Sequence, residues 1–232
     1  MPESERIPNV APVDPFEGGD VSLRKRFFAL TYDRQMVKVE RAGLRAHREH
    51  LLSSLSGRVL EIGGGTGSNL SSYGVAVESL TITEPDPYML RRLEARVREQ
   101  MPTARVLRAP AEDLPFGDDA FDAVVSTLVL CGVDDQPRAL REIYRILRPG
   151  GQLVFFEHVR SDDPKVARQQ DRMNAVNRFV AGCECNRPTL ESIRGAGFDV
   201  EVAAATLEKV PWFLRPSIVG HARVALTTKA GS

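Results

Sequence analysis

The sequence predicts an α/β fold in which a doubly wound, mostly parallel sheet of seven strands is covered by helices on both faces. Short apolar segments, which are typical of buried strands, alternate along the chain with segments whose apolar residues recur at helical spacing. Such alternation implies right-handed crossovers between parallel strands. In addition, an apolar segment that ends at Glu61 runs directly into the glycine-rich turn Gly63–Gly67. A strand followed by such a turn and a helix is typical of the ligand-binding half of this fold class.

The expected elements cover the chain from residue 21 onward. Residues 21–55 are predicted to be helical, with Leu23, Phe27 and Leu30 on one side and arginines on the other. We expect parallel strands at residues 58–62, 80–84, 105–108, 122–128 and 152–157. Two connecting helices are expected from their apolar stripes. The first stripe is Met89, Leu93 and Val97, and the second is Leu140, Ile143, Tyr144 and Leu147. The second helix ends at Pro149-Gly150-Gly151. Beyond residue 159 we expect a polar helical insertion at 163–182, a helix at 187–195 and strands at 198–203 and 221–228.

The length and composition favour one domain preceded by a flexible arm. A chain of 232 residues suits a single domain with a sizeable core. Residues 1–20 are rich in proline and glycine and are predicted to form the arm, which leaves residues 21–232 as the domain. We expect the helical segment 21–55 to act as a lid over this domain; contact with a membrane surface is the alternative.

The charge and cysteine content exclude several classes of protein. The 31 basic residues equal the 31 acidic ones, which argues against a broad nucleic-acid-binding face. Three cysteines are too few for a disulfide scaffold, and no segment approaches the ~20 apolar residues of a membrane span. The first ten residues show no secretory pattern. We therefore expect a cytoplasmic protein without a stable membrane span whose partner is a small molecule and not a nucleic acid. The sequence does not determine the oligomeric state.

The acid before the glycine turn indicates the kind of ligand. Glu61 would repel the pyrophosphate of a dinucleotide but suits a cationic amino group such as that of S-adenosylmethionine. Glycines follow it at alternate positions (Gly63, Gly65, Gly67), and Ser68 stands where a nicotinamide or flavin fingerprint requires a third glycine or alanine. We therefore expect S-adenosylmethionine as the cofactor. The alternatives are a nicotinamide or flavin site and a strand-to-helix turn that binds nothing.

The ends of the next strands supply further candidates. Glu84 ends the second strand about twenty residues after the turn, where an acid accepts hydrogen bonds from both ribose hydroxyls of an adenosine; a solvated acid is the alternative. Ala111 and Glu112 follow the third strand and are placed to bracket an adenine, although acids are common in loops. The fourth strand ends in the segment from Thr127 to Cys131, at the same edge of the sheet.

Two residue types at this edge suggest chemistry. His158 ends the fifth strand and titrates near neutral pH, so it is the candidate general base, with a structural histidine as the alternative. Cys131 is expected to be a small buried residue beside the methyl donor rather than a nucleophile or ligand. Cys183-x-Cys185 resembles half of a zinc site, but no second pair of ligands is evident, so no metal is expected.

These motifs make the chain resemble the class I S-adenosylmethionine-dependent methyltransferases, which have a Rossmann-like sheet. The resemblance rests on Val59-Leu-Glu-Ile-Gly-x-Gly-Thr-Gly, Ala111-Glu-Asp-Leu-Pro-Phe and Leu147-Arg-Pro-Gly-Gly. Within this class the chain is most similar to the microsomal alkyl thiol S-methyltransferases, also called methyltransferase-like seven proteins. The shared pieces include Tyr32-Asp33, Gly65-Thr-Gly-Ser-Asn69, Glu84-Pro-Asp-Pro87, Thr127-Leu-Val-Leu-Cys131, Phe156-Glu-His-Val159, Gly182-Cys183, Arg187-Pro-Thr189 and Trp212.

The resemblance implies roles for particular residues. The cofactor site would comprise Tyr32, Glu61, Gly63, Gly65, Gly67, Asn69, Glu84, Pro85, Ala111, Glu112 and Thr127. Two features differ from the microsomal relatives, which begin with a hydrophobic anchor that we do not find here and have cysteine where this chain has Gly64.

The expected reaction is methyl transfer to a small molecule, most readily to a thiol, which is already partly ionised at neutral pH. The acceptor would contact Phe28, Cys131 and Trp212, between the lid and the segments 159–187 and 205–220. The alternatives are an O- or C-methyltransferase acting on a phenolic, quinone-like or natural-product acceptor, and a catalytically silent protein that only binds the cofactor.

Overall fold

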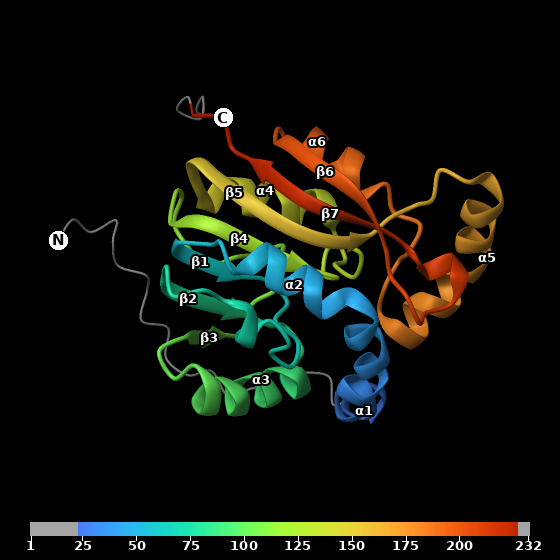
Figure 1. Ribbon diagram of the computed structural model, residues 1–232, viewed down its shortest axis with the longest axis horizontal. Coiled ribbons are helices and arrows are strands. Elements are labelled where there is room, and N and C mark those ends of the chain that lie inside the picture. Colours follow the sequence, from blue (N-terminus) through green and yellow to red (C-terminus); the bar gives the residue numbers. More distant parts are fainter. Residues whose placement is uncertain (1–22, 227–232) are drawn as a thin grey trace.

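The computed structural model describes residues 23–226 and contains the expected seven-stranded sheet (Figure 1). The predicted arm at residues 1–20 lies outside the described residues. The strand order is β3-β2-β1-β4-β5-β7-β6. The first five strands in this order are parallel, whereas β7 is antiparallel to both β5 and β6. The doubly wound, mostly parallel α/β fold is therefore confirmed.

The bounds of the elements are as follows. The strands are β1 Gly57–Glu61, β2 Val77–Thr83, β3 Arg105–Leu107, β4 Phe121–Thr127, β5 Leu147–His158, β6 Asp199–Thr206 and β7 Pro216–Arg223. The helices are α1 Leu23–Val39, α2 Arg45–Leu52, α3 Pro87–Gln100, α4 Gln136–Ile146, α5 Pro164–Ala181 and α6 Thr189–Gly195. Among residues 23–226, no helix combines the length and the apolar character needed to cross a membrane.

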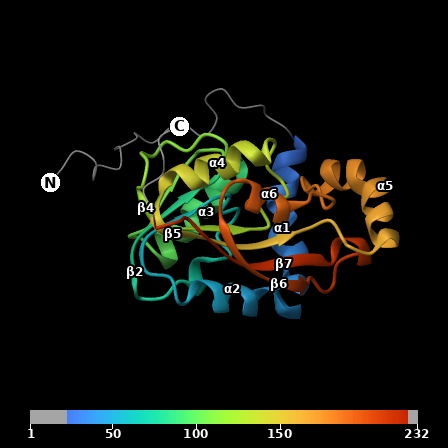
Figure 2. The same ribbon diagram turned by 90° about the horizontal axis from the view of Figure 1, so that it is seen from above.

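Two apolar layers hold the helices against the sheet, because successive strand residues point to opposite faces. Val124 of β4 packs in one layer with α4 and α6, whereas its neighbour Val125 packs in the other with α2 and α3. Figure 2 shows α2 and α4 on opposite sides of the sheet. In α4 the apolar residues Leu140 and Ile143 are fully buried, as the spacing in the sequence predicts.

The N-terminal helical segment differs from the prediction in two ways. It is interrupted at Glu40–Leu44, a π-helical segment in which Gly43 has a non-helical φ of 135°. The rotation of α1 is also not the expected one, because Phe27 and Leu30 are 68% and 62% exposed while Ala29 is buried. Asp33, which lies on the same side of α1 as Ala29, pairs with two arginines of α3, in agreement with this orientation.

Several predicted boundaries are wrong. The glycine turn is followed by further turns and a short 3-10 helix, Leu70–Ser72, and not by a regular α-helix. The last strand is Pro216–Arg223 instead of 221–228, because proline lacks an N–H and is tolerated at a strand's first residue. Likewise α4 ends at Ile146, and Leu147 already belongs to β5.

Candidate active site

A cavity of about 410 Å³ lies at the carboxyl ends of the parallel strands. Its walls come from α1, the glycine turn, the loops after β2, β3 and β4, and the end of α5. The lining residues include Phe28, Tyr32, Gly63, Gly65, Glu84, Pro85, Ala111, Glu112, Leu128, Val129, Gly132, Val133, Val180 and Gly182. A smaller cavity shares Tyr32, Gly63 and Gly65 and is also lined by Arg48, Glu61, Asn69 and Thr127. The structure therefore brings together every predicted cofactor residue except Gly67, which lines neither cavity.

Three glycines of the turn, Gly63, Gly64 and Gly67, have no room for a side chain. Gly63 has a φ of +55°, which favours glycine, and a Cβ there would lie 2.7 Å from Val129 Cγ1. A Cβ at Gly64 would lie 2.3 Å from Ile82 Cγ2, so a cysteine at this position would require Ile82 to move. Gly67 is packed against Leu70 and keeps the turn compact. The turn therefore presents bare backbone to the cavity.

Glu84 lies directly after β2 and lines the large cavity. Its side chain is 6% exposed, and its two oxygens accept hydrogen bonds from the backbone N–H groups of Gly65 and Asp86, each at 2.8 Å. Burial raises the pKa of Glu84 from 4.5 to about 7, although these two N–H groups lower it. Glu84 therefore changes its charge near neutral pH while it is held beside the glycine turn.

Glu61 lies at the end of β1 in a buried polar network. Asn69 Nδ2 donates to its Oε1 at 3.0 Å, and the Tyr73 hydroxyl donates to its Oε2 at 2.6 Å. Arg48 of α2 donates to Asn69 Oδ1 at 2.6 Å and pairs with Glu40. Burial raises the pKa of Glu61, and the hydrogen bonds from Tyr73 and Asn69 oppose this rise. Neither Arg48 nor Tyr73 was predicted to belong to the site, because nothing in the sequence distinguishes them from other helix arginines and loop tyrosines.

The loop after β3 is tied to the segment that precedes α4. Glu112 Oε1 accepts hydrogen bonds from the backbone N–H groups of Asp134 and Asp135, at 2.7 and 3.2 Å. Both Ala111 and Glu112 line the large cavity. Glu112 therefore joins two sides of the cavity mouth.

Helix α1 covers the glycine turn. The Thr66 hydroxyl donates to Asp33 Oδ1 at 2.5 Å, and the other oxygen of Asp33 pairs with Arg92 and Arg96 of α3. One turn earlier on α1, Phe28 lines the large cavity. Neither Thr66 nor the two arginines were candidates, because only the folded chain brings α1, the turn and α3 together.

Behind the cavity wall lies a cluster that does not line either cavity. His158 Nδ1 is 3.8 Å from Cys131 Sγ and 3.4 Å from Cys183 Sγ. Hydrogen bonding with Cys183, together with burial, raises the pKa of the Cys131 thiol well above its ordinary value. Burial lowers the pKa of His158. The hydrogen bond and the electrostatic interaction with Cys131 outweigh this effect, so the pKa of His158 is raised.

Buried Glu157 fixes the turn that follows β4. One of its oxygens accepts hydrogen bonds from Ser126 Oγ at 2.6 Å and from the backbone N–H groups of Val129 and Leu130, at 2.9 and 3.1 Å. The turn includes Leu128, which has a left-handed φ of 59° and lines the cavity. Glu157 precedes the predicted His158 directly, yet its own structural role was not anticipated.

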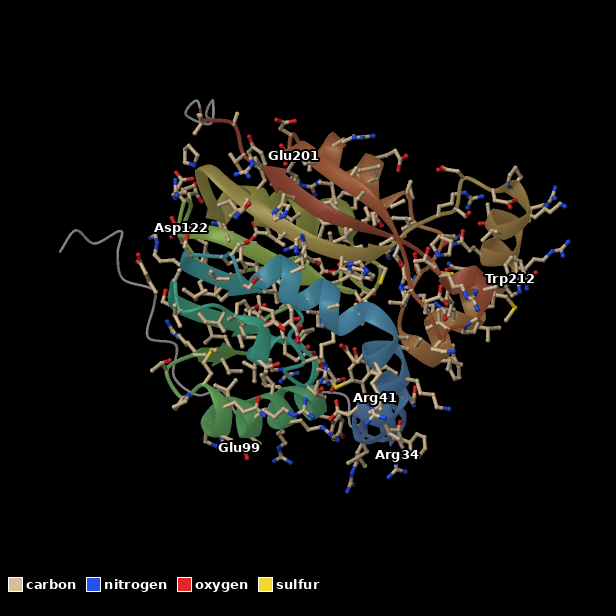
Figure 3. All side chains as sticks on the ribbon, in the orientation of Figure 1. Arg34, Arg41, Glu99, Asp122, Glu201 and Trp212 are labelled. Carbon is tan, nitrogen blue, oxygen red and sulfur yellow. The ribbon has the colours of Figure 1, made fainter. Side chains whose placement is uncertain are left out.

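Trp212 lies beside α5 and outside both cavity linings (Figure 3). Its side chain is 52% exposed and meets Phe213 edge to face, with ring centroids 6.1 Å apart. The predicted contacts of His158, Cys131 and Trp212 with an acceptor therefore stay predictions.

The large cavity is acidic and apolar. Its lining includes Glu84, Asp86, Glu112 and Asp134 and contains no lysine or arginine among the described residues. A cavity of this kind does not offer the cations that would bind a pyrophosphate. It suits an adenosine-containing ligand that carries no phosphate and has a positive charge.

Comparisons with known proteins agree with this geometry. A family model described as a methyltransferase domain matches residues 60–155. The chain is 31% identical to thiol S-methyltransferase TMT1A of Homo sapiens over 201 residues, which cover 84% of this chain and 82% of that protein. It is 40% identical to thiol S-methyltransferase TMT1B of Homo sapiens over 179 residues, which cover 74% and 73%.

A solved structure shows the same fold. It is described as an S-adenosylmethionine-dependent methyltransferase and possible histamine N-methyltransferase from Thermotoga maritima, with a TM-score of 0.64 and 24% identity, and covers 86% of this chain and 98% of that one. The fold, the cavity at the strand ends and the extent of the sequence match lead to one conclusion. This chain belongs to the S-adenosylmethionine-dependent methyltransferases, in the family that includes the thiol S-methyltransferases TMT1A and TMT1B.

Proposed function

We propose that this enzyme methylates the sulfur of an apolar thiol. The observation that carries the proposal is the extent of the match to the two thiol S-methyltransferases. It covers up to 84% of the chain, whereas the general methyltransferase domain covers only residues 60–155. The similarity therefore reaches beyond the residues that match the general methyltransferase domain.

The residues of the two cavities divide into distinct proposed roles. We assign Glu84 to the ribose hydroxyls, Ala111 and Glu112 to the adenine, and the Glu61 network to the cationic amino group. When bound, S-adenosylmethionine supplies an electrophilic methyl group on a sulfonium sulfur. The glycine turn, Phe28 and Tyr32 align the cofactor and the acceptor and exclude water. Alignment and exclusion of water are the main contributions of the protein, because methyl transfer converts a charged sulfonium into a neutral thioether.

The apolar part of the large cavity supports an uncharged acceptor. Phe28, Val129, Val133 and Val180 line it. Burying the charged groups of glutathione or free cysteine against such side chains costs free energy unless each charge finds a partner. An alkyl thiol carries no charged group, so its burial in this cavity does not have this cost.

A thiol also needs little activation, because its sulfur is intrinsically very nucleophilic. Cysteine, with a pKa near ~8.5, is a few per cent thiolate at neutral pH, and an alkyl thiol, whose pKa is higher, ionises to a smaller extent. The proposal therefore does not depend on His158 as the base, which stays a separate prediction, since His158 lies outside the lining of both cavities. The proposal also places the enzyme in the cytoplasm, which the three free cysteines support. It assigns the enzyme a small-molecule acceptor and not a nucleic acid, which the net charge of zero supports.

A panel of acceptors tests the proposal. The purified enzyme and S-adenosylmethionine are incubated with alkyl thiols, glutathione, phenols and quinols, and methylated products are identified by mass spectrometry. We expect methylation of the apolar thiols and little or none of glutathione. Ready methylation of phenols or quinols with no thiol accepted would contradict the proposal and favour an O- or C-methyltransferase.

A further inference from the structure

Three side chains from separate parts of the chain converge behind the cavity wall. Cys131 follows β4, His158 ends β5, and Cys183 follows α5. Their ligand atoms, two sulfurs and one ring nitrogen, all lie within 4.8 Å of one another and are buried. We propose that Cys131, His158 and Cys183 bind a divalent metal ion of the zinc type.

The spacing of these atoms fits such an ion. A tetrahedral zinc with bonds of ~2.3 Å to sulfur and ~2.0–2.1 Å to nitrogen holds a sulfur and a nitrogen about 3.6 Å apart. The measured separations from His158 Nδ1 are 3.4 Å to Cys183 Sγ and 3.8 Å to Cys131 Sγ. Both nitrogen-to-sulfur distances therefore match an ion held between the three atoms. The two sulfurs lie within 4.8 Å of each other, and they would approach to about 3.8 Å on such an ion.

The chemistry of the ligands selects the class of ion. Thiolate and imidazole ligands favour zinc over magnesium or calcium, which prefer oxygen. Two thiolates also balance the double charge of the ion, so the buried complex is neutral and avoids the cost of an unpaired charge. Three protein ligands leave the fourth position to water or another small ligand.

Surrounding hydrogen bonds hold two of the ligands in place. The backbone oxygen of Cys131 accepts from the Glu184 N–H at 2.8 Å, and that of Cys183 accepts from Asn177 Nδ2 at 2.6 Å. The Cys131 N–H donates to Glu157 at 3.3 Å. Outer contacts of this kind orient metal ligands.

The proposed site adjoins the cavity through two glycines. Gly132 and Gly182 each neighbour one of the ligand cysteines and line the large cavity. They pack so closely that a Cβ on Gly132 would lie 2.9 Å from the Gly182 oxygen. A bound ion would thus fasten the end of α5 to the loop after β4 and fix this wall of the cavity. This consequence does not depend on the identity of the acceptor.

Metal binding by the full-length protein tests the inference without any activity measurement. Metal-free protein, kept reduced, is titrated with Zn²⁺ against a chromophoric chelator and separately with Co²⁺, whose sulfur-to-metal absorption reports thiolate ligands. The variants are Cys183→Ser, His158→Gln and the control Cys185→Ser. Cys185 is also a buried free cysteine but does not belong to the cluster. Circular dichroism confirms that each variant is folded.

We expect wild type and Cys185→Ser to bind one equivalent of Zn²⁺ and to melt at a higher temperature with it. Cys183→Ser and His158→Gln should each weaken Zn²⁺ binding by at least ~100-fold. Loss of an outer-shell contact can already cost this much, and these variants each lose a direct ligand. Because Cys183 is only partly buried, its serine variant is the one best placed to stay folded. Three results would overturn the inference: no stoichiometric binding by wild type, unchanged binding by folded Cys183→Ser, or equal losses in Cys183→Ser and Cys185→Ser.

Discussion

Glu84 makes cofactor binding depend on pH in a way that can be calculated from the structure. Burial raises its pKa to about 7, so the carboxylate is largely protonated at pH 6 and largely ionised at pH 8. If the ribose hydroxyls bind the ionised form, affinity for S-adenosylmethionine should fall about tenfold from pH 8 to pH 6, because the ionised fraction falls by that factor. The charge-assisted hydrogen bonds lost in Glu84→Gln are worth roughly 1.5–3 kcal/mol each before water compensates.

Calorimetric titration at pH 6, 7 and 8 measures this effect. The proteins are wild type, Glu84→Gln and the control Glu99→Gln. Glu99 is exposed on α3, away from the cavity, so its substitution removes the same charge elsewhere (Figure 3). Glu84→Gln should bind more weakly at pH 8 and lose most of the pH dependence, whereas Glu99→Gln should behave as wild type. A pH dependence in Glu84→Gln equal to that of wild type would refute the reasoning.

The same residue predicts a cost in the stability of the free protein. Because the pKa of Glu84 is raised on folding, the folded state binds more protons than the unfolded state between pH 4.5 and about 7. The free energy of unfolding therefore decreases as pH rises through this window, by about 3 kcal/mol for a shift of this size. Urea denaturation at pH 5 and pH 8 should show a smaller decrease in Glu84→Gln than in wild type. Equal decreases in the two proteins would contradict this assignment.

Three further substitutions probe the cavity and its surroundings. Phe28→Ala should raise the KM for an alkyl thiol several-fold, whereas Phe27→Ala, one residue away but 68% exposed, should not; equal effects would remove Phe28 from the acceptor site. Asp33→Ala should weaken S-adenosylmethionine binding in calorimetry, because it frees α1 from the glycine turn and α3, whereas Asp171→Ala removes an exposed ion pair with Arg160 and a hydrogen bond from Asn186 and should leave binding unchanged. Trp212→Ala, measured by the same kinetics, should raise the KM less than Phe28→Ala does, since Trp212 lies outside the cavity lining; a larger effect would place the acceptor beside α5.

Those features that depend on local sequence could be predicted. The strand that ends at Glu61, its glycine turn and Glu84 belong to short segments whose order fixes their place at one edge of a parallel sheet. The same logic located Ala111 and Glu112. Hydrophobic spacing identified α4 because one of its faces is buried along its length.

Features that depend on contacts between distant segments were missed. Periodicity placed Phe27 and Leu30 on one side of α1, but it did not show that both are exposed or that Asp33 pairs with α3. Cys183 clusters with His158, at the end of β5, and with Cys131, in the loop after β4, and not with Cys185, two residues away. Similarly, the Arg48–Asn69–Glu61 network joins α2, the turn and β1, and no spacing along the chain indicates it.

Internal competition within one acceptor tests the central claim most directly. The enzyme is given an apolar molecule that carries both a thiol and a phenol, together with S-adenosylmethionine labelled in its methyl group. Fragmentation of the product by mass spectrometry then shows which atom received the label. The account predicts label on sulfur, because a thiolate is a much stronger nucleophile than a phenolate toward a sulfonium methyl carbon and the family match is to thiol S-methyltransferases. Label on oxygen or on a ring carbon, with sulfur unmodified, would contradict it.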